Sequence, residues 1–221
     1  MNMSDDTGGK ETSATLSAYL ALRDMILTGA LAAGQKLKIE DLRAILDTGA
    51  SPVREALSLL TSDMLVERLD QRGFRAAPVS DANFREILTL RCTLEDLALR
   101  QSIAAATPAW EENVVLAHHR MKKAAVKDAA TFERAHKAFH MALLSNSGSP
   151  VLERYCAQLY DLNIRYRNLA AHDNAYDERD VSAEHDAILD AVVGLDAARA
   201  CGILQRHYRV TGEYLSRSMD I

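Results

Sequence analysis

Histidine is the residue type whose placement in this sequence offers the clearest chemistry. All seven histidines lie beyond residue 117, and His136 and His140 are four positions apart. On a helix this spacing puts both rings on one face, where their nitrogens can bind one metal ion. A chain with seven histidines also produces such a pair by chance, so a packed cluster without metal is the alternative.

The remaining histidines and tyrosines of this region are predicted to have structural roles. His118 and His119 are adjacent, so their rings cannot face one centre, and a solvated helix surface is predicted. His172, beside Asp173, is predicted to cap a loop at a helix end. A tyrosine buries its ring and leaves its hydroxyl in water, which favours a place in the core or at its rim for Tyr155, Tyr160 and Tyr166.

Arginines in the first 78 residues form a second group of candidates, suited to binding nucleic acid. Arg54 lies in the first turn of a predicted helix, where Ser51 and the helix N-terminus can also meet phosphates. Arg72 and Arg75 flank Gly73 in a predicted hairpin, and glycine allows DNA to approach the backbone closely. The segment holds 9 basic and 11 acidic residues, so an ordinary solvated ion pair at Arg54 is the alternative.

The elements that position these arginines are short helices and a hairpin. The predicted elements are helices over 13–28, 39–46 and from Pro52 onward, and strands over 64–69 and 74–77. Ser51 is predicted to be the N-cap of the third helix, with Pro52 at its first position. Three helices and a hairpin within residues 13–78 form a winged helix-turn-helix, whose third helix enters the major groove. Residues 1–12 are polar and are predicted to be disordered.

Residues 79–221 are predicted to form an all-helical second domain, an antiparallel bundle of roughly six helices. The residues expected as N-caps of its helices are Ser80, Thr107, Ser149, Ser182 and Asp196. The helix that starts at Ser80 places Arg91 on the same face as apolar residues, although Arg91 can also form a surface pair with Glu95. A predicted helix over residues 134–144 carries the histidine pair.

Composition places the chain among mainly α-helical proteins. Its 221 residues are 48% hydrophobic and include 10 glycines and 4 prolines, a balance typical of helix. No apolar run approaches the roughly 20 residues that a membrane span needs, and no apolar leader is present at the start. Three widely spaced cysteines without a C-x-x-C pair indicate a reduced cytoplasmic protein. The net charge of −5 gives no support to non-specific binding of polyanions.

Three stretches of the first domain resemble the DNA-binding domain of GntR-type bacterial regulators. They are LKIEDL at 37–42, ASPVREAL at 50–57 and LVERLDQRGF at 65–74. The resemblance covers about residues 13–79 and implies that Arg54, the arginine of V-R-E, contacts the operator. Glu40 and Ala50 replace two further family arginines, so a different operator or a larger contribution from the hairpin is expected. The DNA-binding residues expected on this basis are Lys38, Ser51, Pro52, Arg54, Arg72, Gly73 and Arg75.

The remainder resembles the FCD effector domain, whose metal-binding members carry D-x-x-F-H-x-x-L followed by two later histidines. This chain has HKAFHMAL at 136–143, so His136 replaces the family's aspartate. The resemblance implies a metal site formed by His136, His140, His185 and His207. Four neutral imidazoles leave the full charge on a divalent ion, which favours Zn²⁺ and tight binding of an anion, with Ni²⁺ and Mn²⁺ as further candidates.

The resemblance also implies an effector. Arg91 matches the family's pocket arginine, and Arg165 or Arg167 is a candidate for a second contact with a carboxylate. The expected effector is a small carboxylate or dicarboxylate with one end on the metal. The expected function is that of a cytoplasmic homodimeric repressor, which leaves its pseudo-palindromic DNA operator when the effector binds.

Two other functions remain open from the sequence. A histidine-bound metal with an open position can activate water, which would make the chain a metal-dependent enzyme acting on a small carboxylate. The metal-binding helix has no histidine–glutamate general-base motif, and a winged domain has no role in such an enzyme; both points argue against it. The third function is that of a DNA-binding protein whose helical bundle serves only to dimerise.

Overall fold

The computed structural model describes residues 7–125, 128–170 and 180–218, and the chain divides into two compact units. Unit 1 comprises Met1–Ser80 together with Ile164–Leu169, and unit 2 comprises Asp81–Asn163 and Ala170–Ile221. The division after Ser80 lies close to the sequence-based boundary at residue 78. The segment Ile164–Leu169 is the exception, because the sequence alone assigns it to the second domain.

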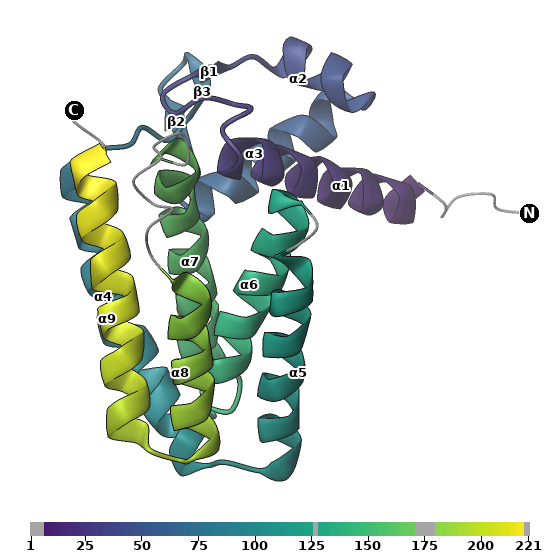
Figure 1. Cartoon of the computed structure of the whole chain (residues 1–221). Helices are drawn as coiled ribbons and strands as arrows, with labels where there is room; N and C mark the ends of the chain where they lie inside the picture. Colours follow the sequence, from purple (N-terminus) through teal and green to yellow (C-terminus); the bar gives the residue numbers. More distant parts are fainter. Residues whose placement is uncertain (1–6, 126–127, 171–179, 219–221) are drawn as a thin grey trace, which may run out of the picture. The chain divides into compact units, whose positions relative to one another are not determined.

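Unit 1 is a winged helix-turn-helix, as the sequence predicts. Its elements are α1 (Thr7–Leu27), β1 (Lys36–Leu37), α2 (Ile39–Leu46), α3 (Ala50–Ser62), β2 (Val66–Leu69) and β3 (Gly73–Ala76). The strands form an antiparallel sheet in the order β1-β3-β2, and the β2–β3 hairpin is the wing (Figure 1). Leu22 of α1, Leu57 of α3 and Phe74 of β3 are buried, so the helices and the sheet bury their apolar faces within the unit.

The start of α3 differs from its prediction. The helix begins at Ala50 with Gly49 as its N-cap, so Ser51 is not the N-cap and Pro52 is the third helical residue. Proline is tolerated there because the first four N–H groups of a helix lack intrahelical partners. The Ser51 hydroxyl donates instead to Glu55 Oε1, at 3.1 Å.

The beginning of unit 1 also differs from its prediction. α1 starts at Thr7, so residues 7–12 are helical rather than disordered, while residues 1–6 lie outside the described residues. β1 was not expected, because a strand of two residues is too short for an alternating pattern to show in the sequence.

Unit 2 is a helical bundle. Its elements within the described residues are α4 (Asp81–Ala104), α5 (Pro108–Ala124), α6 (Ala129–Leu144), α7 (Pro150–Ala170) apart from the segment Ile164–Leu169, α8 (Val181–Val193) and α9 (Ala197–Ser218). α9 packs on α4 and α8, and α5 packs on α6 and α8 (Figure 1). Leu99, Phe139 and Leu204 are among the buried residues of one continuous core. None of the described helices combines the length and apolar character that crossing a membrane requires.

Most of the predicted helix starts in unit 2 are confirmed by side-chain caps. Three predicted N-caps accept hydrogen bonds from main-chain N–H groups, namely Thr107, Ser149 and Asp196. The prediction for Ser182 is wrong, because Asp180 caps α8 by accepting from the N–H of Ala183. The helix with the histidine pair is longer than predicted, since Asp128 caps it and Ala129 is its first residue.

Candidate metal centre and DNA-contacting residues

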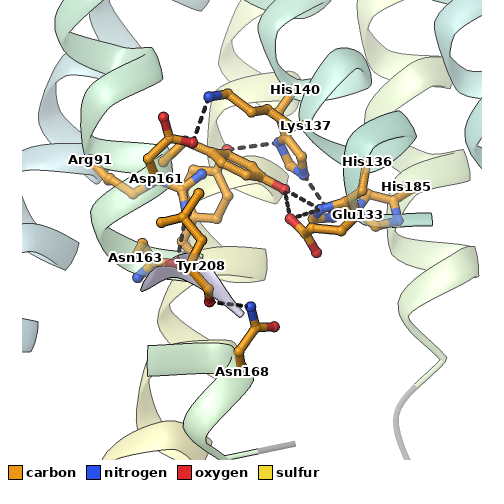
Figure 2. Close-up of polar contacts among 12 residues, drawn as sticks. Arg91, Glu133, His136, Lys137, His140, Asp161, Asn163, Asn168, His185 and Tyr208 are labelled. Atoms are coloured by element: carbon orange, nitrogen blue, oxygen red, sulfur yellow. Dashed lines mark hydrogen bonds and ion pairs between the residues drawn. The ribbon is translucent and has the colours of Figure 1, made fainter. Parts of the chain in front are cut away.

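The structure brings together the four histidines expected to bind a metal. His136 and His140 come from α6, His185 from α8 and His207 from α9, and all four are buried. One ring nitrogen from each lies within 4.8 Å of the others. The Nε2 atom of His136 is 3.1 Å from Nε2 of His140 and from Nε2 of His185 (Figure 2). Nitrogens bound about 2.0–2.1 Å from one zinc ion are separated by similar distances.

Hydrogen bonds on the outer side of the rings fix the tautomers of two histidines. The hydroxyl of Tyr160 donates to Glu133 Oε1 at 2.6 Å, so its oxygen accepts a hydrogen bond from His136 Nδ1, also at 2.6 Å. Tyr208 likewise donates to Glu95 and accepts from His140 Nδ1, at 2.8 Å. With the proton on Nδ1, the Nε2 lone pair of each ring points into the cluster.

His207 is oriented in the same way by a carboxylate. Its Nδ1 donates to Glu184 Oε2 at 2.7 Å, which places the proton on Nδ1 and the lone pair on Nε2. A carboxylate or hydroxyl behind a metal-binding imidazole is the usual arrangement in metal sites, because it orients the ring and raises its basicity. Such lone pairs in a buried space repel one another unless a cation or a proton lies between them. The donor set therefore fits a divalent ion.

Electrostatics keeps the two α6 histidines neutral. Burial, and then the charges of the neighbouring histidines and Arg91, hold the pKa of His140 well below its ordinary value, and the pKa of His136 is lowered in the same direction. A neutral imidazole is the form that binds metal. These two ligands are consequently available to an ion at pH values where an exposed histidine is partly protonated.

We expect the metal-free protein to lose stability as the pH falls below about 6.5, the pKa of an exposed histidine. Unfolding exposes His136 and His140, which then bind protons that the folded state does not, so acid favours the unfolded chain. Each histidine contributes a slope of about 1.4 kcal/mol per pH unit between its unfolded and folded pKa.

Urea unfolding in EDTA at pH 7, 6 and 5 measures this slope. The His140→Asn variant, which takes up no proton at that position, is expected to show a slope that is shallower by up to about 1.4 kcal/mol per pH unit. If this variant lost as much stability with falling pH as the unchanged protein, His140 would not be a source of the pH dependence.

Arg91 of α4 lies beside the histidine cluster rather than on the surface. Its Nε donates to Glu95 Oε1 at 2.7 Å. Its Nη1 donates to Asn163 Oδ1 at 2.9 Å (Figure 2). The guanidinium carbon lies 4.9 Å from the ring centre of Tyr160 and 4.1 Å from that of Tyr208. The Arg91–Glu95 pair exists, but only 5% and 1% of the two side chains are exposed, so the interpretation as a surface pair is wrong.

One nitrogen of the Arg91 guanidinium has no hydrogen-bond acceptor among the described residues. This nitrogen, Nη2, is buried. Burial alone lowers the pKa of Arg91, but Glu95 and the two tyrosines raise it overall, so the guanidinium stays charged. Tyr160 and Tyr208 each touch both Arg91 and a histidine, which places the free donor and the histidine nitrogens in one buried region.

The other two predicted effector arginines belong to a different unit from the histidines. Arg165 and Arg167 fall in the segment Ile164–Leu169, which belongs to unit 1. Arg165 is buried, and its Nη2 donates to the main-chain oxygen of Ala77. Arg91 is thus the predicted effector arginine that belongs to the same unit as the histidines.

Some residues with predicted structural roles lie elsewhere than expected. His118 is buried, with Nε2 3.0 Å from Asp186 Oδ1, so the solvated surface predicted for it is wrong, whereas His119 is exposed. The burial of His118 could have been predicted from its helical spacing, because His118 lies four positions after Val114 and three before Met121, both buried. His172 lies outside the described residues.

Two of the three tyrosines are in the core. Tyr166 is buried and accepts a hydrogen bond from the N–H of Ser80, and Tyr155 is exposed. Tyr160 is buried against His136, so it is a site residue that sequence reasoning missed. The other missed residues that contact a site side chain are Glu133, Asn163, Glu184 and Tyr208, whereas Glu95 was named only as a surface partner of Arg91.

The predicted DNA-contacting residues of unit 1 fall into two groups. Arg54, Lys38 and Arg72 are exposed, and their side chains have no ion pair or hydrogen bond among the described residues. Gly73 adopts φ +90°, a conformation that favours glycine at this turn. Arg75 is different, because its guanidinium is bound to Glu67. Ser51 and Pro52 lie in the first turn of α3.

Comparison with known proteins gives a consistent result for both units. Residues 14–75 match the model of bacterial regulatory proteins of the gntR family, and residues 86–210 match the FCD domain. The chain is 37% identical over 198 residues to an uncharacterized HTH-type transcriptional regulator, BphR, of Paraburkholderia xenovorans, which covers 86% of this chain and 80% of that protein. It is 29% identical over 204 residues to the HTH-type transcriptional repressor GlaR of Escherichia coli, a match that covers 89% of this chain and 93% of that protein.

A solved structure shows the same fold. Escherichia coli McbR/YncC superposes with a TM-score of 0.80 at 21% identity, over 92% of this chain and 97% of that one.

Proposed function

Because the chain belongs to the GntR family of bacterial regulatory proteins and carries an FCD domain, it is a DNA-binding transcriptional regulator, and we propose that unit 2 makes it responsive to a small carboxylate. The observation that carries this proposal is the convergence of four histidine nitrogens beside a buried arginine with one unused donor. The interpretation as an enzyme is not retained, since the relatives are named transcriptional regulators.

The metal proposed for this site is Zn²⁺, with Ni²⁺ and Mn²⁺ as alternatives. His136, His140, His185 and His207 would hold it through nitrogen donors, which suit Zn²⁺ and similar first-row ions. A bound divalent ion supplies positive charge and open coordination positions to an anionic oxygen. The chain itself supplies neutral imidazoles, so none of the ligands reduces that charge.

The proposed effector is a mono- or dicarboxylate small enough for a buried region. Arg91 is preorganised for one of its oxygens, because Glu95, Asn163 and the two tyrosine rings fix the guanidinium before any ligand arrives. Nη2 then makes a charge-assisted hydrogen bond that it otherwise lacks in a buried position. A dicarboxylate can place one carboxylate on the metal and the other on Arg91.

We further propose a homodimeric repressor that effector binding releases from DNA. The relative GlaR is named a repressor, which supports this direction of the response. On α4, Leu90 and Leu97 are 44% and 46% exposed and are seven positions apart, so they form an apolar stripe suited to a second copy. Two copies would present two α3 helices to the half-sites of a pseudo-palindromic operator.

Loss of the base-reading arginine is expected to separate specific from non-specific DNA binding. Arg54→Ala should weaken binding to the operator by about 1–3 kcal/mol, roughly 5- to 150-fold, because a bidentate arginine–guanine contact is lost. Binding to random duplex should change much less. Fluorescence anisotropy with both duplexes measures the difference, and titration at high protein concentration gives the number of chains per operator, expected to be two.

An equal loss on both duplexes would contradict the base-reading role of Arg54. Addition of acetate, malonate or succinate to the metal-loaded protein–operator complex tests the sensor: release supports the proposal. An operator complex that none of the three affects, with or without metal, would favour a helical unit that serves only to dimerise.

A further inference from the structure

Three charged residues form a row across the sheet of unit 1. Lys36 of β1 is the register partner of Arg75 in β3, and Arg75 is the register partner of Glu67 in β2. Register partners lie on the same face of a sheet because side chains alternate along each strand. Arg75 is in the middle, with a cation on one side and a carboxylate on the other.

The guanidinium of Arg75 is committed to the carboxylate. Its Nε donates to Glu67 Oε2 at 2.7 Å, and its Nη2 is 2.6 Å from the same oxygen. Lys36 and Arg75 are like charges opposite each other in the β1–β3 pair. Their repulsion favours an Arg75 side chain that points toward Glu67. Arg54, Lys38 and Arg72 have no such partner among the described residues, so Arg75 is the predicted DNA-contacting arginine whose charge is already neutralised.

The Arg75–Glu67 pair can open when DNA approaches. The side chains are 41% and 40% exposed, and exposed ion pairs typically contribute no more than about 1 kcal/mol. A phosphate competes with Glu67 for the same donors of Arg75. Glu67 opposes that exchange in two ways. Its ion pair with Arg75 must first break, and its carboxylate, once unpaired, repels the nearby phosphates.

We propose that Glu67 is a positioning residue that limits the affinity of the wing for the DNA backbone, acting through Arg75. This inference rests on the DNA-binding role of unit 1 and adds a residue to which no role in DNA binding has been assigned. Its ligand is the phosphate backbone, so the effect is independent of base sequence. The regulator thereby keeps the sequence-independent part of its affinity low, although it presents several arginines to DNA.

A double-mutant cycle on random duplex DNA tests the proposal. Glu67→Gln is expected to raise the affinity roughly three- to tenfold and to steepen the salt dependence by about 0.9, the value for one additional phosphate contact. Arg75→Gln is expected to remove this gain, so the double variant should bind like Arg75→Gln alone. The readout is anisotropy titration at several salt concentrations.

Asp24→Asn provides the matched control. Asp24 is an exposed acid of α1 in the same unit, without an ion pair among the described residues, and its replacement changes the net charge equally. This variant is expected to leave affinity and salt dependence unchanged. Thermal unfolding of every variant is expected to show a retained fold, because the Arg75–Glu67 pair is exposed and contributes little to stability.

Three results would overturn the proposal. They are an unchanged affinity in Glu67→Gln, a gain that persists without Arg75, and an equal gain in Asp24→Asn. Failure of the DNA-binding role itself is distinguishable, because the unchanged protein would then bind neither duplex.

Discussion

Adding Zn²⁺ to the metal-free protein is expected to raise its melting temperature, and His140→Ala is expected to abolish the rise. A ligand at 1,000 times its dissociation constant stabilises the folded state by about 4.1 kcal/mol, and for a chain of this size 1 kcal/mol corresponds to about 2–4 °C. The expected shift is therefore roughly 8–16 °C. His140 is buried, and its Nε2 lies at the convergence point of the cluster, so the variant removes a ligand from the centre.

The control for this experiment is another histidine of the same unit. His119 is exposed on α5, and His119→Ala should keep the full Zn²⁺-dependent shift. The metal content of protein purified without a histidine tag is the second measurement, with one ion per chain expected. Sub-stoichiometric metal together with melting that is unchanged by EDTA would exclude the site, and a full shift in His140→Ala would exclude this ligand set.

Arg91→Lys is expected to raise the carboxylate concentration needed to release DNA by roughly 10- to 150-fold. The substitution keeps a charge to pair with buried Glu95 but removes the planar guanidinium and its free Nη2 donor. A hydrogen bond to a charged group contributes about 1.5–3 kcal/mol, which corresponds to that range of affinity. The measurement is half-release of operator from metal-loaded protein with the most effective of acetate, malonate and succinate.

Arg100→Lys is the matched control for this prediction. Arg100 lies on the same helix and pairs with Asp96 four positions away, but 48% of its side chain is exposed. Its replacement should leave the half-release concentration unchanged. Both variants should bind operator like the unchanged protein when no carboxylate is present. An Arg91→Lys protein with an unaltered response would show that the effector does not use the free donor.

Signals within short stretches of sequence were sufficient for most of the fold. The hydrophobic period of α2, the turn before Gly73 and the caps at Thr107 and Asp196 each depend on neighbours a few positions away. The same kind of local signal was misplaced by two positions at α8, where Asp180 rather than Ser182 is the N-cap. The motif around Arg54 also identified the winged domain, because its residues are contiguous.

The histidine site could be predicted only in part from the sequence. The sequence determined the candidate ligands, since His136 and His140 share a helix face and the two later histidines fall in a recognisable order. The hydrogen bonds that orient the rings join residues far apart in the chain, 24 positions for His136 and Tyr160 and 68 for His140 and Tyr208. No periodic pattern encodes such pairs, so sequence reasoning missed both tyrosines.

Charged residues show what only the tertiary structure decided. By itself the sequence determined that this chain has a winged helix-turn-helix followed by a helical bundle, and which histidines and arginines could bind. It left undecided that Arg91 is buried with a spare donor, that Arg165 binds the main chain at Ala77 and that Arg75 binds Glu67. An arginine has a long, flexible side chain, so its partner is chosen by the acceptors that folding brings within reach.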